Sequence, residues 1–568
     1  MSDFQVKVAP KTYDAVIVGS GAGGGMAAYV LAKAGLKVCL LEAGPDFDPA
    51  KHSSQMKNPW ESPRRGASTK MRPFGDFDAS FWGWEIDGEP YTQTKGADHF
   101  DWWRARMVGG RTNHWGRISL RFGPKDFKRK SIDGLGDDWP IGYEDVKPYY
   151  DKIDKLIGVY GTNEGLENDP DGIFLPPPKP RLHELMFKKA ATGINIPVIP
   201  SRLSILTKKI NDERGACFYC GQCNRSCKVY GDFSSSSVLV KPAVMTGNVD
   251  MITGAMAREV LTDNEGKAKG ISYVNKMDKQ EYQINAKVVI LGASTCETAR
   301  LLLNSKSQKH PNGLANSSGV VGHYLHDSTG AALGGVIPNL MGRKRYNEDG
   351  VGGMHVYTPW WLDNKKLDFP RGYHIEYWGG MSQPGYGFGM GTQGLNGKFK
   401  VNGKTKEEGG YGSSLKEDVR FFYGASVGMG GRGEAVPRFE NHCKIDPNVV
   451  DKYGIPVLNF DCKNSEYEIK QAKHMKETFR EIMHEMGAVI TWGDQDDASN
   501  NYGLSNPGNI IHEAGTVRMG SAYDCKNLFC VDGSVFTSQA DKNITWTILA
   551  LSMRTSEYIL DQLQKQNL

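Results

Sequence analysis

Residues Tyr13–Gly24 read Tyr-Asp-Ala-Val-Ile-Val-Gly-Ser-Gly-Ala-Gly-Gly. The first half is a short apolar run bounded by charge and glycine, which is typical of a buried parallel strand. The second half places Gly19, Gly21 and Gly24 in a G-x-G-x-x-G pattern. In such a turn the first glycine permits a tight bend, the second lets backbone approach a pyrophosphate, and the third allows close helix packing. The stretch therefore predicts a strand, a nucleotide-binding turn and a helix whose N-terminus stabilises phosphate charge.

The residues that follow support a dinucleotide site. Met26–Ala34 is an Ala-rich segment closed by Gly35, which predicts a helix, and Lys37–Leu41 predicts a second strand. Glu42 ends that strand, 23 positions after Gly19, where an acidic side chain can accept hydrogen bonds from a ribose. Because an acid stands here rather than an arginine, FAD or NAD is favoured over NADP.

Bulk properties limit the remaining choices. The 568 residues suggest roughly three to four domains, and 39% hydrophobic and 24% charged residues are ordinary for a soluble globular enzyme. A net charge of +4 is too small to indicate nucleic acid or an anionic membrane as a partner. Met1–Asp14 has no apolar h-region, and no apolar run approaches the roughly 18 residues of a spanning helix. We expect neither a signal peptide nor a direct membrane span.

Further along the chain, the pattern predicts a return to the nucleotide sheet and then a second domain. Ala286–Ala293 resembles another buried strand that opens onto a helix near Ser294, after a hairpin at Asp263–Gly266. We expect it to be the third strand of the sheet. Residues 330–500 hold short alternating segments with many Gly and Pro, and one clear helix over Glu466–Met486. They predict an antiparallel sheet with helices behind it, suited to binding substrate.

Two irregular stretches lie between these elements. Pro45–Trp103 has little periodicity and many aromatic residues, so it predicts a lid, a binding loop or an interface. Arg104–Gly116 carries adjacent glycines, polar side chains and an aromatic residue, which fits a loop that passes close to an extended ligand. Pro140–Leu156 is expected to be helical after its first turn.

Four cysteines fall within eleven residues, at Cys217, Cys220, Cys223 and Cys227. The spacing C-x2-C-x2-C-x3-C is that of an iron–sulfur ligand run. Zinc competes with this interpretation, although zinc sites usually split their ligands into two separated pairs. Structural cysteines without a metal are the third interpretation. Lys228 stands where two-cluster ferredoxins commonly have proline, so that fold is not expected.

Polar and glycine residues also gather near the other end of the chain. His512 opens the segment His512–Gly520, and the amide of Asn543 follows 31 positions after it. A lone histidine is more often structural than catalytic. Here, however, the predicted dinucleotide needs a reactive partner. A histidine with a pKa near 6.5 can act as a base at neutral pH.

Together these motifs resemble the glucose-methanol-choline (GMC) oxidoreductases. The matching segments are Gly19–Gly24, Glu42, Gly109–Gly110, Gly292–Ala293, His512–Gly520, Asp532–Ser534 and Asn543–Thr545. The resemblance implies an α/β fold (α+β overall): a Rossmann-like FAD-binding domain and a substrate domain built on a six-stranded antiparallel sheet backed by helices. We expect the FAD domain to comprise residues 1–45, 104–130, 215–329 and 505–568. We expect the substrate domain, with its lid and insertion, to comprise 46–103, 131–214 and 330–504.

The resemblance also implies roles for single residues. His512 would be the general base that takes the proton of a substrate alcohol, and Asn543 would donate a hydrogen bond to the same oxygen. The helix near Thr545 would point its N-terminus at the flavin ring. His114 occupies the place where some members attach flavin covalently. The cofactor-binding residues would be Gly19, Gly21, Gly24, Glu42, Gly109, Gly110, Asn113, His114, Trp115, Gly292, Asp532, Gly533, Asn543 and Thr545.

Within the family, the cysteine run resembles the large subunits of bacterial sugar dehydrogenases, and glucoside 3-dehydrogenases are also similar. This implies a [3Fe–4S] cluster on Cys217, Cys223 and Cys227, while Cys220 as a fourth ligand would make [4Fe–4S]. It further implies oxidation of a sugar or glycoside hydroxyl, with electrons passing to a cytochrome or quinone. A small companion subunit would carry the export signal to the periplasm; otherwise the chain is cytoplasmic. An oxygen-dependent oxidase with structural cysteines, and a non-enzymatic flavin or zinc module, are the alternatives.

Overall fold

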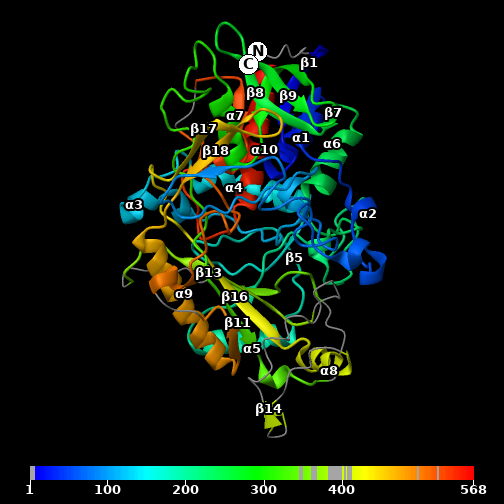
Figure 1. Cartoon of the computed structure of the whole chain (residues 1–568), viewed down its shortest axis with the longest axis vertical. Helices are drawn as coiled ribbons and strands as arrows, with labels where there is room; N and C mark the ends of the chain where they lie inside the picture. The colour runs from blue at the N-terminus through cyan, green and yellow to red at the C-terminus, as the bar shows by residue number, and fades with distance from the viewer. Residues whose placement is uncertain are drawn as a thin grey trace.

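The computed structural model describes residues 7–343, 350–359, 367–381, 400–401, 404–405, 412–494, 498–520 and 524–568. Two large sheets lie towards opposite ends of the long axis (Figure 1). The overall class is mixed α/β, as predicted. Within the described ranges, no helix combines the length and the apolarity that a membrane crossing requires.

The first sheet is built around the N-terminal strand. Its strands are β1 (Lys7–Val18), β2 (Val38–Glu42), β7 (Val249–Thr253), β8 (Ala255–Thr262), β9 (Ala268–Asn275), β10 (Glu281–Leu291) and β20 (Leu528–Cys530). The order is β7-β2-β1-β10-β9-β8, and β20 pairs with β10. The pairs among β7, β2, β1, β10 and β20 are parallel, whereas β8, β9 and β10 form antiparallel pairs. The parallel part is the predicted Rossmann-like sheet.

One assignment in this sheet was wrong. The strand predicted at Ala286–Ala293 is β10, which does lie beside β1, but it is not the third parallel strand of the chain. That place belongs to β7, which pairs with β2 on the other side of the sheet. β7 spans only five residues and includes the charged Asp250, so it lacks the apolar run that revealed the other strands.

Alternate residues of the parallel strands enter two separate cores. Val16 of β1 packs in one core with Val289 and with Ala299 of α7 (Thr295–Asn304). Ile17 packs in the other core with Leu31 of α1 (Ala22–Lys33). Because helices cover both faces, these strands are apolar throughout rather than alternating. α1 also packs against α10 (Thr545–Gln564), so the C-terminal helix completes the layer begun by the N-terminal one.

The second sheet has six strands, and every neighbouring pair is antiparallel, as predicted. In order they are β19 (Val489–Trp492), β11 (Ala332–Val336), β16 (Ser426–Gly433), β13 (Tyr373–Gly379), β12 (Val356–Thr358) and β6 (Ile199–Pro200). The helices α5 (Leu182–Gly193) and α9 (Glu466–Glu485) share a core with it. α9 ends one residue before the predicted limit. It begins after Ser465, whose hydroxyl caps the first turn while Glu468 completes a capping box.

Smaller elements connect the two sheets. The remaining helices are α2 (Pro49–His52), α3 (Arg129–Asp133), α4 (Tyr143–Ile157), α6 (Lys241–Met245) and α8 (Gly412–Phe422). The remaining strands are β3 (Thr92–Gln93), β4 (Val159–Tyr160), β5 (Phe174–Leu175), β14 (Lys400–Val401), β15 (Lys404–Thr405), β17 (His442–Val450) and β18 (Pro456–Asp461). α4 matches the helix predicted over Pro140–Leu156. The stretch Pro45–Trp103 is irregular as expected. Its end is packed, since Phe100 stacks on Phe460 with ring centroids 4.2 Å apart, whereas Trp60 is 74% exposed.

Candidate active site

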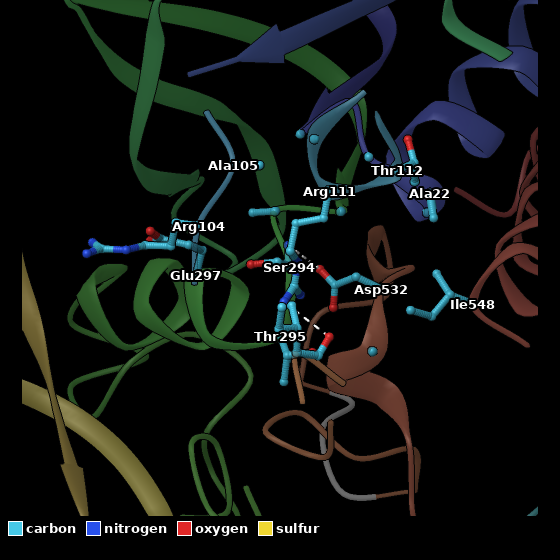
Figure 2. A pocket seen from close by; sticks show the side chains of 18 of the residues that line it. Ala22, Arg104, Ala105, Arg111, Thr112, Ser294, Thr295, Glu297, Asp532 and Ile548 are labelled. Carbon is cyan, nitrogen blue, oxygen red and sulfur yellow. Dashed lines mark hydrogen bonds between the residues drawn. The ribbon is translucent and has the colours of Figure 1, made fainter. Parts of the chain in front are cut away.

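A cavity of about 420 Å³ lies at the carboxyl ends of the parallel strands. The first sheet contributes Glu42 at the end of β2 and Gly292 just after β10. The second sheet contributes Glu376 from β13 and Arg432 from β16. Figure 2 shows Ser294, which follows β10, hydrogen-bonded to Asp532, another residue that lines the cavity. The carboxyl edge of a parallel sheet is where open α/β folds bind their ligands.

The glycine turn leaves room for a phosphate group only at its middle position. A Cβ on Gly19 would lie 2.4 Å from the carbonyl oxygen of Gly292, and one on Gly24 would lie 1.9 Å from the carbonyl oxygen of Gly19. A Cβ on Gly21 would meet no atom within 4 Å. Gly21 also caps α1 without a side-chain hydrogen bond, so the first N–H groups of the helix remain available to an anion. These features fit a pyrophosphate.

Glu42 has the geometry of a ribose acceptor. Its Oε2 accepts hydrogen bonds from the backbone N of Ser20 at 3.2 Å and from the Ser20 hydroxyl at 2.5 Å. Its Oε1 accepts one from Gly44 N at 2.8 Å. A carboxylate offers about four acceptor positions, so one remains for a hydroxyl in the cavity.

Asp532 connects its own turn to the start of α7 at the cavity wall. Its Oδ2 accepts hydrogen bonds from Ser294 N at 3.1 Å and from the Thr298 hydroxyl at 2.6 Å, while its Oδ1 accepts one from Ser534 N at 2.9 Å. Burial raises the pKa of Asp532, although these hydrogen bonds oppose that effect. The bonded turn holds Gly533 at the cavity wall.

The loop over Gly109–Trp115 divides into supporting and lining residues. Gly110, His114 and Trp115 line the cavity. Asn113 is fully buried and instead holds the turn, since its Nδ2 donates to the carbonyl of Val108 at 2.8 Å. Gly109, with φ of +87°, supports the same turn. Gly109, Asn113 and Gly24 are therefore the predicted cofactor residues that do not line the cavity.

His114 is held on two sides. Its Nδ1 lies 2.5 Å from Asp78 Oδ1, and the Trp103 ring meets it edge-on with centroids 4.4 Å apart. These contacts fix the ring at the cavity wall. Covalent attachment of flavin to this histidine stays a prediction.

The structure brings His512 and Asn543 into contact. His512 Nε2 lies 3.3 Å from Asn543 Nδ2, and its Nδ1 lies 3.0 Å from the Ser328 hydroxyl. Its backbone N donates to Asp327 at 2.8 Å. Burial and the charge of Arg432 lower the pKa of His512 to about 3, so the ring is neutral near pH 7. Thr545, the first residue of α10, lies beside this pair on the cavity wall, and no side chain caps the helix.

The motifs missed several lining residues, among them the charged residues Glu376, Arg432 and Arg111. Glu376 accepts a hydrogen bond from Asn543 Nδ2 at 3.2 Å and pairs with Arg432 at 2.8 Å. Arg111 pairs with Glu513 at 2.6 Å and so links the glycine loop to the histidine segment. One available signal was the glutamate inside strand β13, whose other residues are apolar, aromatic or glycine apart from His374.

The four predicted metal ligands lie on one loop outside the cavity lining. Backbone groups already donate to two of the sulfur atoms. Tyr219 N lies 3.3 Å from Cys217 Sγ, and Gly352 N lies 3.3 Å from Cys223 Sγ. Burial raises the pKa of the Cys217 thiol to about 12 and also raises that of Cys223.

The side-chain amide of a buried glutamine donates hydrogen bonds to the other two cysteines. Gln55 Nε2 lies 3.1 Å from Cys220 Sγ and 4.0 Å from Cys227 Sγ. Four thiols with N–H donors are chemically suited to an iron–sulfur cluster. Among the described residues, however, no group of three or more His, Cys, Asp and Glu is gathered to hold a metal ion. The cluster and its ligands therefore stay predictions.

Comparison with known proteins decides the family. Two GMC oxidoreductase models match residues 201–329 and 437–552, and an FAD binding domain model matches 14–55. The chain belongs to the GMC oxidoreductase family. It is accordingly an FAD-dependent oxidoreductase that acts on CH–OH groups, and the non-enzymatic alternatives are excluded.

Several relatives of this GMC oxidoreductase match nearly its whole length. It is 29% identical to the 2-methyl-1,2-propanediol dehydrogenase of Mycolicibacterium austroafricanum, over 96% of this chain and 95% of the relative. It is 25% identical to the fructose dehydrogenase large subunit of Gluconobacter japonicus, over 97% and 98%. The structure of pyridoxine 4-oxidase from Mesorbium loti matches with a TM-score of 0.61 and 16% identity, over 96% and 99%, which supports the fold alone.

Proposed function

We propose that this GMC oxidoreductase is a dehydrogenase that oxidises a hydroxyl group of a sugar or glycoside. The contact between neutral His512 and Asn543, beside the dinucleotide turn, carries the proposal. FAD, when bound, accepts the hydride from the carbinol carbon. Gly21, Glu42, Asp532 and the N-terminus of α10 would hold its pyrophosphate, ribose and ring regions.

The protein's own groups handle the proton. The lone pair of His512 Nε2 takes the hydroxyl proton as the C–H bond breaks, which leaves a carbonyl product and a protonated imidazole. When the substrate oxygen lies between the two side chains, the Asn543 Nδ2 hydrogen that otherwise faces His512 donates to that oxygen instead and stabilises its developing negative charge. The 3.3 Å contact between the two side chains places both groups within reach of one oxygen atom.

A polyhydroxylated substrate suits the far wall of the cavity. A guanidinium carries five N–H donors, and the described contacts of Arg432 use two of them, to Gly431 and Glu376. Further donors can bind substrate hydroxyls. Relatives named for a diol and for fructose support this class. The anomeric carbon of glucose and ring carbon three of a glucoside are the proposed positions of oxidation.

The cysteine loop supports a dehydrogenase rather than an oxidase. We propose an iron–sulfur cluster, [3Fe–4S] or [4Fe–4S], on Cys217, Cys220, Cys223 and Cys227, because an oxidase needs none. A cytochrome or quinone would be the acceptor. The relative named as a large subunit supports a small companion subunit, and we propose co-export with it to the periplasm.

A dye-reduction screen tests the function. Purified protein would be offered glucose, methyl glucosides, gluconate and fructose, with product regiochemistry read by NMR and peroxide measured in air. Flavin bleaching by one of these sugars, with little peroxide and with iron in the protein, supports the proposal. Rapid peroxide formation by iron-free protein would favour the oxidase, and failure of all these sugars to reduce the flavin would overturn the substrate class.

A further inference from the structure

The pair formed by His512 and Asn543 has a third member from the other sheet. Glu376 is the fourth residue of β13, and its side chain is buried at the cavity wall. Its Oε1 lies 3.2 Å from Asn543 Nδ2, and its Oε2 lies 2.8 Å from Arg432 Nη2. One carboxylate therefore touches both the proposed catalytic amide and an arginine that the six-stranded sheet contributes to the lining.

The charge of Glu376 fixes which way the Asn543 amide points. Burial alone would raise the pKa of Glu376, but Arg432 and His374 outweigh it and lower the pKa to about 2. An ionised carboxylate can only accept hydrogen bonds. If the Asn543 amide were turned over, its oxygen would face the carboxylate oxygen as a second acceptor. Nδ2 must therefore face Glu376.

The amide orientation in turn fixes the histidine tautomer. The second Nδ2 hydrogen points towards His512 Nε2 at 3.3 Å, and this contact is favourable only if that nitrogen carries a lone pair. The proton then lies on Nδ1, which donates to the Ser328 hydroxyl oxygen at 3.0 Å. The same oxygen also accepts a hydrogen bond from Gln539 Nε2. A hydroxyl oxygen has two lone pairs, so one remains to accept from His512.

We propose that Glu376 is a positioning residue that holds His512, through the Asn543 amide, in the tautomer with a free Nε2 lone pair. The proposal rests on the proposed function of His512 as base. It also connects two parts of the fold. β13 belongs to the antiparallel sheet, whereas Asn543 lies just before α10, the helix that packs against α1. The Asn543 Oδ1 atom is buried and has no hydrogen-bond partner among the described residues.

The tautomer can be observed directly in the FAD-loaded protein. Histidine labelled with nitrogen-15 gives distinct signals for protonated and unprotonated ring nitrogens, and His512→Gln identifies the signals of interest. We expect a single tautomer with the proton on Nδ1 in the unmodified protein. In Glu376→Gln the neutral amide can donate or accept, so the signals should shift towards a mixture. A proton on Nε2 in the unmodified protein, or an unchanged tautomer in Glu376→Gln, would overturn the proposal.

Glu184→Gln is a matched control. Glu184 is also a buried glutamate, paired with Arg181 at 2.6 Å and close to His355 at 3.4 Å, but it does not line the cavity. This variant should leave the His512 signals unchanged. If Glu184→Gln altered them as much as Glu376→Gln does, the effect would be general destabilisation, and the proposal would be rejected.

Kinetics give a second, independent test. With the most active sugar of the screen, Glu376→Gln should slow anaerobic flavin reduction by about twofold to tenfold, because only the fraction of molecules in the tautomer with a free Nε2 lone pair can take the proton. Added to Asn543→Ala, the same substitution should have little further effect, since both remove one connection. Additive losses would show that Glu376 acts without Asn543. If the screen finds no sugar, the substrate proposal fails while the tautomer measurement still decides this one.

Discussion

At the scale of single residues, the proposed mechanism depends on a histidine that burial keeps neutral. His512 Nε2 faces Asn543, and its own Nδ1 is held by Ser328. A buried imidazole without a carboxylate directly bonded to it favours the uncharged form. Its unprotonated nitrogen is therefore available to a substrate throughout the neutral range.

His512→Ala should slow flavin reduction by roughly 10²- to 10⁴-fold, the usual contribution of a general base. FAD should stay bound, because the phosphate and ribose contacts lie elsewhere. Stopped-flow absorbance measures both quantities. His99→Ala is the control, since His99 is largely exposed and does not line the cavity. Unchanged reduction by His512→Ala would remove the histidine from the mechanism.

The depressed pKa of His512 predicts the pH dependence. A base with a pKa of about 3 is already unprotonated at pH 5, so flavin reduction should be flat between about pH 5 and pH 8. Because the unfolded histidine binds its proton near pH 6.5, this group's contribution to stability is full above that value and is lost as the pH falls towards 3. Rapid-mixing measurements across this range would contradict the assignment if the rate fell with an apparent pKa near 6.5.

At the scale of elements, two glycines of one turn meet different requirements, one for packing and one for ligand binding. Gly24 belongs to the packing of α1, because a Cβ there would lie 1.9 Å from the carbonyl of Gly19. Gly21 is expected to serve ligand binding instead, because a Cβ there would meet nothing within 4 Å and its φ of −66° suits any residue. The same pattern of three glycines thus combines a folding constraint with a binding constraint.

Substituting each glycine by alanine should separate these duties. Gly21→Ala should leave the stability of the FAD-free protein within about 0.5 kcal/mol but weaken FAD binding by on the order of tenfold or more. Gly24→Ala should destabilise the FAD-free protein by about 1–3 kcal/mol, because backbone must move. Thermal unfolding with and without added FAD distinguishes them. Equal losses of stability in the two variants would show that the turn is not open at Gly21.

At the scale of the whole molecule, the cavity joins two sheets while the cysteine loop lies apart from it. The loop is held by Gln55 from the long irregular stretch and by Gly352 from the segment before β12. The proposed route for electrons therefore leaves the site on the side where these separate segments meet.

Cys220→Ser and Cys223→Ser test the ligand set of that route. If three cysteines hold a [3Fe–4S] cluster, Cys220→Ser should keep its iron and its electron paramagnetic resonance signal. Cys223→Ser should lose both. Flavin reduction by sugar should survive in each variant, since neither residue lines the cavity. Iron lost from both variants would indicate a four-cysteine cluster, and iron-free parent protein would refute the cluster itself.

Local patterns predicted the parts of the fold that repeat at short range. The strand ending at Val18, the glycine turn and the capped helix α9 each depend on neighbours in sequence. Glu376 and Arg432 could not be predicted in the same way, because strand pairing between β13 and β16 brings them together, not a motif. The place of β7 as the third parallel strand was not predicted, since its pairing with β2, rather than its composition, assigns it to that position.

The last part of the chain completes the first sheet and the helix layer beside the glycine turn. β20 pairs with β10, and α10 packs on α1, so residues beyond Leu528 complete a layer that begins at Lys7. During synthesis, a nascent chain still lacking those residues has an open nucleotide crevice. We therefore expect stable cofactor binding only after β20 and α10 have joined the first sheet and α1.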